Sequence, residues 1–178
     1  MDVEDQIESL KKTIRDVPDF PKPGIVFKDI TTLLKDPLAF RRAMDLFTVL
    51  CDGRPVDKVV AIESRGFILG SALALRLGVG FVPVRKPGKL PTKLVRATYE
   101  LEYGKDALEM HEDAVASGES VLIVDDVIAT GGTASATAKL VERLGGEVAG
   151  FSFVLELGFL HGRDKLNGYR VEAVAAYD

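Results

Sequence analysis

The sequence predicts an α/β protein with a mostly parallel central sheet flanked by helices. A short apolar run at residues 59–62 is followed by a helical pattern that ends at Gly78, and a second apolar run follows it. Strand–helix–strand order of this kind builds parallel sheets. The order recurs farther along, where an apolar run at 121–124 precedes a helical pattern over 133–144. The chain shows no internal repeat and no linker, so we expect a single domain over residues 1–178.

The N-terminal part is predicted from apolar spacing and from proline. Apolar residues at helical spacing predict a first helix over residues 2–15. Three prolines and a glycine within residues 16–30 block regular helix and favour an extended segment at the surface. Asp36 and Pro37 form an N-cap and a first helical turn, which predicts a second helix ending near Cys51.

The other elements follow from alternation and from turn residues. Residues 97–103 and 107–111 alternate apolar with polar side chains about Gly104, which predicts an antiparallel hairpin at an edge of the sheet. Residues 147–157 and 169–177 predict two closing strands.

Composition limits the classes of function. A formal net charge of −4 and a pI near 5.3 argue against general nucleic-acid or membrane-surface binding, which usually needs a basic excess. The acidic N-terminus lacks the apolar core of a signal peptide, and no run of about 18 apolar residues occurs. The single cysteine, Cys51, has no partner for an intramolecular disulfide, which suits a reducing compartment. We therefore expect a cytoplasmic protein.

The stretch V-L-I-V-D-D-V-I-A-T-G-G-T, residues 121–133, is the strongest candidate site. In α/β sheets ligands bind beyond the carboxyl ends of the strands, and a glycine-containing loop at a helix N-terminus suits a phosphate. Thr130 and Thr133 add hydroxyl donors. Adjacent acids would repel that phosphate directly, so we expect Asp125 and Asp126 to accept hydrogen bonds from a vicinal diol nearby. Phosphate and diol together describe a ribose 5-phosphate.

A simpler interpretation is that Asp126 caps a turn and the glycines only make a tight connection. Against it, adjacent carboxylates at the end of a buried strand cost desolvation and need a reason. The chain also lacks the G-K-S/T ending of a Walker A loop, and no G-x-G-x-x-G follows a predicted strand. These absences argue against nucleotide hydrolases and dinucleotide-binding enzymes.

Two further segments carry positive charge where an anion could use it. Arg65, in E-S-R-G, lies at a predicted strand–helix junction and offers a planar fork to phosphate oxygens, although an ordinary surface arginine would look the same. Residues 85–98 hold five cations and no acid, with a glycine and two prolines, which favours a mobile cover over a packed element, or else a solvated basic loop. The five cations are Arg85, Lys86, Lys89, Lys93 and Arg96.

The motif at 121–133 resembles the phosphoribosyl pyrophosphate signature of the type I phosphoribosyltransferases. Four more segments match that family in its order: P-G-I-V-F-K-D-I at 23–30, E-S-R-G-F at 63–67, R-K-P-G-K-L-P at 85–91 and L-E-Y-G at 101–104. The first and third are typical of members that use adenine. The resemblance implies the family's fold and a role in purine salvage. It also implies the transfer of 5-phosphoribose from phosphoribosyl pyrophosphate to adenine, giving AMP and diphosphate, with Mg²⁺ carried by the diphosphate rather than by protein ligands.

The resemblance also implies a role for each segment. Within residues 1–35, which would hold the N-terminal helix and the base-recognition segment, the backbone of Val26 would read N1 and N6 of adenine, and Phe27 would stack on the ring. Lys28 stands where relatives often have arginine. Glu102 would act as acid or base on the purine, and Tyr103 would position the loop.

The loop at 85–98 would close over the diphosphate, with Arg85, Lys86 and Lys89 as contacts. The implied catalytic residues are Glu102, Arg65 and Lys89. The implied substrate contacts are Val26, Phe27, Lys28, Ser64, Arg65, Gly66, Arg85, Lys86, Lys89, Tyr103, Asp125, Asp126, Ala129, Thr130, Gly131, Gly132, Thr133 and Leu157.

Two alternatives remain. One is a phosphoribosyltransferase for xanthine, guanine, hypoxanthine or orotate. The other is a regulator that keeps the pocket as a sensor and binds DNA or RNA, but this acidic chain shows neither a helix-turn-helix nor a basic face. The resemblance implies a homodimer with no nucleic-acid or membrane partner. Phe151, Phe153 and Leu155 suggest an apolar contact, because the three cannot all be assigned to one face.

Overall fold

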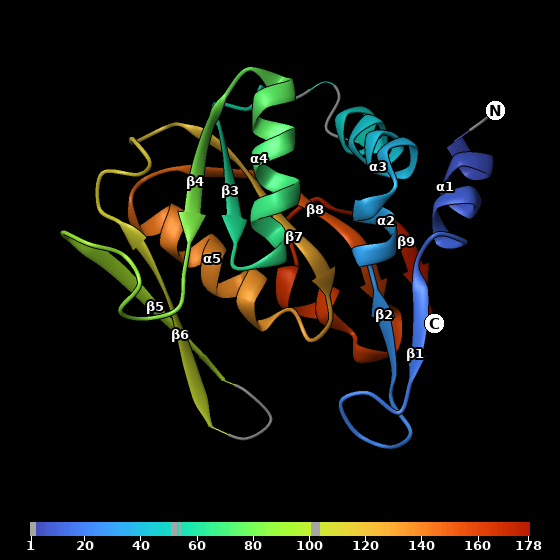
Figure 1. The fold of residues 1–178 in the computed structure, drawn as a ribbon. Helices are drawn as coiled ribbons and strands as arrows, with labels where there is room; N and C mark the ends of the chain where they lie inside the picture. Colours follow the sequence, from blue (N-terminus) through green and yellow to red (C-terminus); the bar gives the residue numbers. More distant parts are fainter. Residues whose placement is uncertain (1–2, 51–52, 54, 101–103) are drawn as a thin grey trace.

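The computed structural model describes residues 3–50, 53, 55–100 and 104–178 (Figure 1). Its centre is a five-stranded sheet in which every neighbouring pair is parallel, as predicted. Cys51, Glu102 and Tyr103 lie outside the described residues. In spatial order the strands are β4 (Gly80–Val84), β3 (Lys58–Ile62), β7 (Ser120–Ile128), β8 (Glu147–Leu157) and β9 (Val171–Tyr177).

Helices cover both faces of this sheet. On one face, α1 (Val3–Lys11), α3 (Pro37–Leu50) and α4 (Arg65–Leu77) pack with side chains of β3 and β7 into one buried apolar cluster. On the other face, α5 (Gly132–Arg143) packs into a second cluster. Figure 1 shows α4 and α5 on opposite sides of the sheet. The predicted α/β class, with helices flanking the sheet, is confirmed.

The N-terminal segment differs from the prediction. The first helix ends at Lys11 rather than near residue 15, because Arg15–Pro18 forms strand β1. This strand pairs with β2 (Val26–Asp29) in a two-stranded antiparallel sheet, so the proline-rich segment is a hairpin rather than a single extended stretch. A short helix α2 (Thr31–Lys35), which the sequence did not suggest, follows it.

The start of α3 follows the predicted cap. The Asp36 Oδ1 atom accepts hydrogen bonds from the backbone N–H groups of Leu38 and Ala39, at 2.8 and 3.0 Å. These bonds satisfy donors that the first helical turn leaves free. They also lower the pKa of Asp36.

The predicted hairpin is confirmed, and it takes part of the predicted loop. Strands β5 (Leu94–Glu100) and β6 (Lys105–His111) pair antiparallel, and β5 packs against α5. Residues 94–98 therefore belong to a strand rather than to the cationic loop, which ends at Lys93. The whole of 85–98 is predicted as one loop because it holds five cations and no acid, although side chains that alternate between two faces are typical of a strand.

The apolar residues that suggested a subunit contact are used inside the fold. Phe151, Phe153 and Leu155 on β8 are all buried, and the rings of Phe151 and Phe153 stack at 6.2 Å between centroids. The strand is flanked by neighbours on both sides and covered on both faces, so these residues do not form an exposed surface. Among the described residues, no helix is both long and apolar enough to cross a membrane.

Candidate active site

The site is built where β7 ends. This strand continues through both acids to Ile128, and a loop of three residues leads into α5, which begins at Gly132. Gly131 has φ +73°, and a Cβ atom there would lie 2.2 Å from the backbone oxygen of Gly162. Only glycine fits this position without displacing the facing backbone. The loop therefore packs closely on the segment after β8 while its N–H groups remain at the helix N-terminus.

A cavity of about 200 Å³ lies against this loop. Of the predicted loop residues, Ala129, Thr130, Gly131 and Thr133 line it, and the N-terminus of α5 gives it the positive end of a helix dipole. Tyr99 of β5 closes one side and was not foreseen as a site residue. The lining residues are Tyr99, Asp125, Val127, Ile128, Ala129, Thr130, Gly131, Thr133 and Ala134.

Asp125 is buried beside this cavity, with 8 % of its surface exposed. Its Oδ1 accepts a hydrogen bond from the backbone N–H of Asp126 at 2.8 Å. Burial, and next the negative charge of Asp126, raise the pKa of Asp125 well above its usual value. A Cβ atom at Gly66 would lie only 2.8 Å from this Oδ1, so the glycine of E-S-R-G-F leaves room for the carboxyl group. A buried carboxyl group with a strongly raised pKa beside a cavity is a candidate for ligand binding.

A larger cavity of about 470 Å³ adjoins the first and shares Val127 and Ala129 with it. Asp126 faces this second cavity, where its Oδ2 accepts a hydrogen bond from Nε of Arg65. The two neighbouring acids therefore line two adjoining cavities. The lining residues are Gly24, Ile25, Val26, Phe27, Lys28, Arg65, Asp126, Val127, Ala129, Leu155, Leu157, Phe159 and Leu160.

The larger cavity has mostly apolar walls, with a few polar groups, which is the usual make-up of a small-molecule site. The ring of Phe27 lies on one wall, with the Arg65 guanidinium carbon 5.6 Å from its centroid. The predicted Val26 and Leu157 are present. Sequence patterns did not lead us to Phe159, although an exposed phenylalanine directly after a buried strand is a signal for a ligand.

Lys28 is used differently from an arginine stacked on a base. Its ammonium group pairs with Asp16 at 2.7 Å and lies 4.2 Å from the centroid of the Tyr177 ring. It lines the larger cavity while it ties the β1–β2 hairpin to β9. Lys28 thus helps to hold this wall of the cavity in place.

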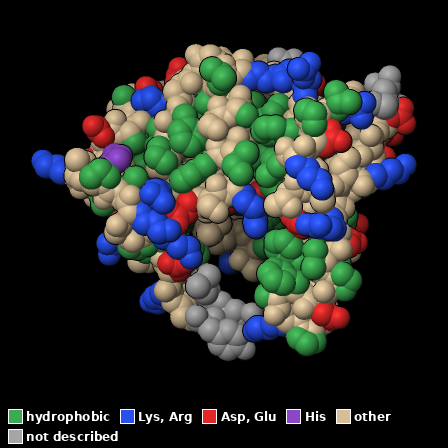
Figure 2. All heavy atoms as spheres, in the orientation of Figure 1, with side chains coloured by type: hydrophobic (Ala, Val, Ile, Leu, Met, Phe, Trp, Pro, Cys, Tyr) green, Lys and Arg blue, Asp and Glu red, His purple; other side chains and the backbone are tan. Residues whose placement is uncertain are grey.

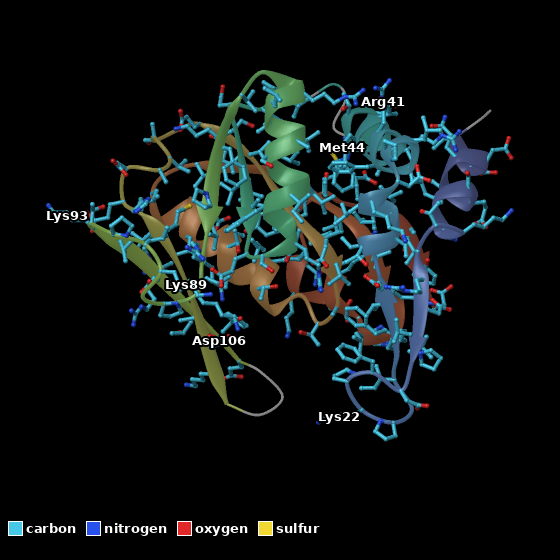
Figure 3. The ribbon with its side chains drawn as sticks, in the orientation of Figure 1. Lys22, Arg41, Met44, Lys89, Lys93 and Asp106 are labelled. Carbon is cyan, nitrogen blue, oxygen red and sulfur yellow. The ribbon has the colours of Figure 1, made fainter. Side chains whose placement is uncertain are left out.

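The charged side chains of the cationic loop pair with two carboxylates beside the site. Lys89 Nζ and Arg85 Nε contact the Glu63 carboxylate at 2.5 and 2.9 Å. Burial alone would raise the pKa of Glu63, but hydrogen bonds from Lys89 and Arg85 outweigh it and lower the pKa. Lys86 pairs with Asp106 of β6 at 2.9 Å. Figure 3 shows Lys93 at the outer end of the hairpin, away from Lys89 and Asp106.

These elements surround a hollow. Figure 2 shows it between the β5–β6 hairpin and the β1–β2 hairpin, with lysine and arginine side chains around its edge. Ser64 and Gly66 lie outside the walls of both cavities, and Gly132 lines a third cavity, of about 330 Å³, next to Tyr99. The predicted Glu102 and Tyr103 fall outside the described residues.

Comparisons with known proteins agree on one family. The model of the phosphoribosyl transferase domain matches residues 29–169. The adenine phosphoribosyltransferase of Myxococcus xanthus is 57% identical over 171 residues, which are 96% of this chain and 93% of that protein.

Two solved structures are similar over their whole length. The adenine phosphoribosyltransferase of Thermoanaerobacter pseudethanolicus has a TM-score of 0.94 and 54% identity, over 96% of this chain and 99% of that chain. The enzyme of Saccharomyces cerevisiae, solved with an imino-altritol bisphosphate and adenine, has a TM-score of 0.92 and 44% identity, over 96% and 99% of the two chains.

Proposed function

The chain belongs to the phosphoribosyltransferase family, and on that premise we propose that it acts in purine salvage. It transfers 5-phosphoribose from phosphoribosyl pyrophosphate to adenine and forms AMP and diphosphate. The curated relatives and the structural neighbours named adenine phosphoribosyltransferase support this substrate over xanthine, guanine, hypoxanthine and orotate.

One observation carries the proposal: two cavities of different chemistry meet at the end of β7. The smaller offers a glycine-containing loop and a helix N-terminus, which suit a phosphate. The larger offers apolar and aromatic walls, which suit a flat base. A nucleoside monophosphate has these two ends, joined by a ribose. Asp125 and Asp126 stand at the junction, where the ribose hydroxyl groups would lie.

The reaction replaces the bond from the ribose C1 atom to diphosphate by a bond to N9 of adenine. Negative charge builds up on the departing diphosphate, and fixed cations near it lower the barrier. Arg85, Lys86 and Lys89 are the cations that we assign to it, on the loop next to the hollow. A closed loop would also exclude water from a centre that water can attack.

Arg65 is predicted to contact the substrate, and its position supports such a contact. It lies in the wall of the larger cavity, paired with Asp126 and near Phe27. We propose that it fixes the Asp126 carboxylate toward the ribose and presents its remaining donors to the ligand. This assignment keeps Arg65 in contact with the reactants without making it the main diphosphate cation.

Selectivity for adenine would come from backbone groups. Adenine presents a donor at position 6 and an acceptor at N1, which the N–H and C=O groups of Val26 can match. A 6-oxopurine would leave buried groups unpaired, at a cost of about 1–3 kcal/mol each. Glu102 is assigned to proton transfer at the purine ring and Tyr103 to the loop, both on the family motif L-E-Y-G.

Mg²⁺ is the cofactor that we propose. Within residues 3–50, 53, 55–100 and 104–178, no group of three or more His, Cys, Asp or Glu side chains could hold a metal ion. Mg²⁺ commonly keeps several of its waters and is bound through substrate phosphates. When bound, Mg²⁺ would neutralise charge on the leaving diphosphate. We also propose a homodimer, on the basis of the family. We propose a cytoplasmic location as well, because a single cysteine has no partner for an intramolecular disulfide and suits a reducing compartment.

The test is a direct assay. The protein is incubated with Mg²⁺ and phosphoribosyl pyrophosphate, and with adenine, guanine, hypoxanthine, xanthine or orotate in turn, and the nucleotide formed is separated by chromatography. AMP as the main product supports the proposal. A 6-oxopurine converted as fast as adenine would overturn the base assignment, and no nucleotide from any base would overturn the function.

A further inference from the structure

Glu109 of β6 is a buried carboxylate that the reaction does not use directly. Only 1% of its surface is exposed. Its Oε1 accepts hydrogen bonds from Nε of Arg96, at 2.9 Å, and from Nη2 of the same guanidinium. Its Oε2 accepts the backbone N–H of Gly88 at 2.9 Å. These partners lie on β5 and in the cationic loop, so one side chain connects the loop to the hairpin.

The backbone of Glu109 makes a second connection to the same loop. Its N–H donates to the oxygen of Arg85 at 2.7 Å, and its oxygen accepts from the N–H of Arg85 at 3.0 Å. The loop is thus fixed at Arg85 and again at Gly88. Lys86 lies between these two points, and Lys89 directly follows the second.

The charge of Glu109 is stabilised where it stands. Hydrogen bonds from Arg96, and next from Gly88, lower its pKa although burial opposes them. A buried carboxylate is costly to desolvate unless hydrogen-bond donors satisfy it, and here Arg96 and Gly88 do so. The lowered pKa therefore favours the ionised form of Glu109, which accepts both hydrogen bonds.

The other contacts of the loop are of a different kind. Glu63 and Asp106 bind the charged ends of Arg85, Lys89 and Lys86, which are the groups assigned to diphosphate. A bound diphosphate competes for those ends. Glu109 instead holds the main chain and leaves the same side chains available.

We propose that Glu109 is a positioning residue that holds the loop at Gly88, so that Lys86 and Lys89 are presented to the diphosphate group. This inference rests on the proposed function. It predicts that loss of the anchor weakens the use of phosphoribosyl pyrophosphate while the use of adenine is unchanged, because the base cavity contains no partner of Glu109 among its described lining residues.

The test compares Glu109→Gln with Glu112→Gln. Glu112 directly follows β6, is exposed, and its carboxylate has no ion pair among the described residues. An amide cannot accept from both Arg96 and Gly88 as a carboxylate does. For Glu109→Gln we expect the KM for phosphoribosyl pyrophosphate to rise at least about tenfold, which is the low end of the effect of one lost hydrogen bond to a charged group. The KM for adenine should stay within about twofold, and Glu112→Gln should match the wild type.

A second readout needs no catalysis. Trypsin can cut the loop after Lys89, and its rate on the ligand-free protein reports loop opening. We expect faster cleavage there in Glu109→Gln, and no change in Glu112→Gln. Arg96→Gln removes the other half of the anchor at a largely exposed side chain and should raise the KM for phosphoribosyl pyrophosphate and the cleavage rate as well. It replaces Glu109→Gln in the test if that variant does not fold.

The outcomes separate two failures. If the wild type forms no AMP, the proposed function fails, whatever the loop does. If the wild type is active and the anchor variants keep its KM for phosphoribosyl pyrophosphate and its cleavage rate, the positioning role is wrong. A rise of both KM values together would also overturn it, because that pattern indicates general damage rather than loss of the loop anchor.

Discussion

Replacing Gly131 by alanine should damage both stability and phosphate binding. The residue has φ +73°, where a side chain costs about 1–2 kcal/mol. The new Cβ atom would also lie 2.2 Å from the backbone oxygen of Gly162, and overpacking of this kind costs about 1–3 kcal/mol. The sum is a loss of about 2–5 kcal/mol in the free energy of unfolding, out of the about 5–15 kcal/mol of an ordinary domain.

Gly118→Ala is the matched control. Gly118 has φ +80° but no atom within 4 Å of its would-be Cβ, so only the backbone cost of about 1–2 kcal/mol applies. Urea unfolding gives the free energies, and calorimetric titration gives AMP binding. We expect AMP affinity to fall at least about tenfold in Gly131→Ala, equal to about 1.4 kcal/mol, and to be unchanged in Gly118→Ala. Equal stability of the two variants together with wild-type AMP affinity in Gly131→Ala would refute the reasoning.

Three further predictions concern the acid, the base cavity and the purine. The raised pKa of Asp125 means that its contribution to stability is fully present below the ordinary value of 3.8 and is lost as pH rises through the folded-state pKa. In urea unfolding, the stability of Asp125→Asn relative to the wild type should therefore be higher at about pH 7 than at about pH 4, and its nucleotide binding should be reduced. An equal stability difference at both pH values would contradict this. Phe27→Leu keeps an apolar wall without the ring, so the KM for adenine should rise about 2- to 10-fold while the KM for phosphoribosyl pyrophosphate is unchanged; a rise in both would argue against base stacking. Glu102→Leu should lower kcat at least about tenfold with an unchanged far-UV circular dichroism spectrum, and wild-type turnover would remove the assignment.

The central sheet could be predicted because its signals are local. Apolar runs, helical spacing and stop glycines lie next to one another in the chain, as at Gly78, which ends α4 in the left-handed conformation. The β1–β2 hairpin could not be seen in the same way. Its strands hold Pro18 and mostly exposed side chains, and they are recognised as strands only by their pairing with each other, which brings Arg15 next to Asp29.

Several of the predicted residues line the two cavities, and part of the geometry also follows from local rules. Asp125 and Asp126 continue strand β7, and neighbouring side chains on a strand point to opposite faces. That rule, applied to the two acids, would have predicted their separation into adjoining cavities. Glu63 and Lys89 are 26 positions apart in the chain. Their contact depends on tertiary structure, so no sequence pattern indicates it.

Val127 and Ala129, shared by the two cavities, have a consequence for ligand affinity. On the proposed assignment, free adenine and free phosphate would each occupy one compartment, and each would lose its own translational and rotational entropy on binding. A nucleotide that bridges them loses that entropy only once, so the second half binds at an effective concentration set by the ribose. The shared wall would thus favour ligands in which one ribose separates the base from the phosphate, over ligands with a shorter or longer connection.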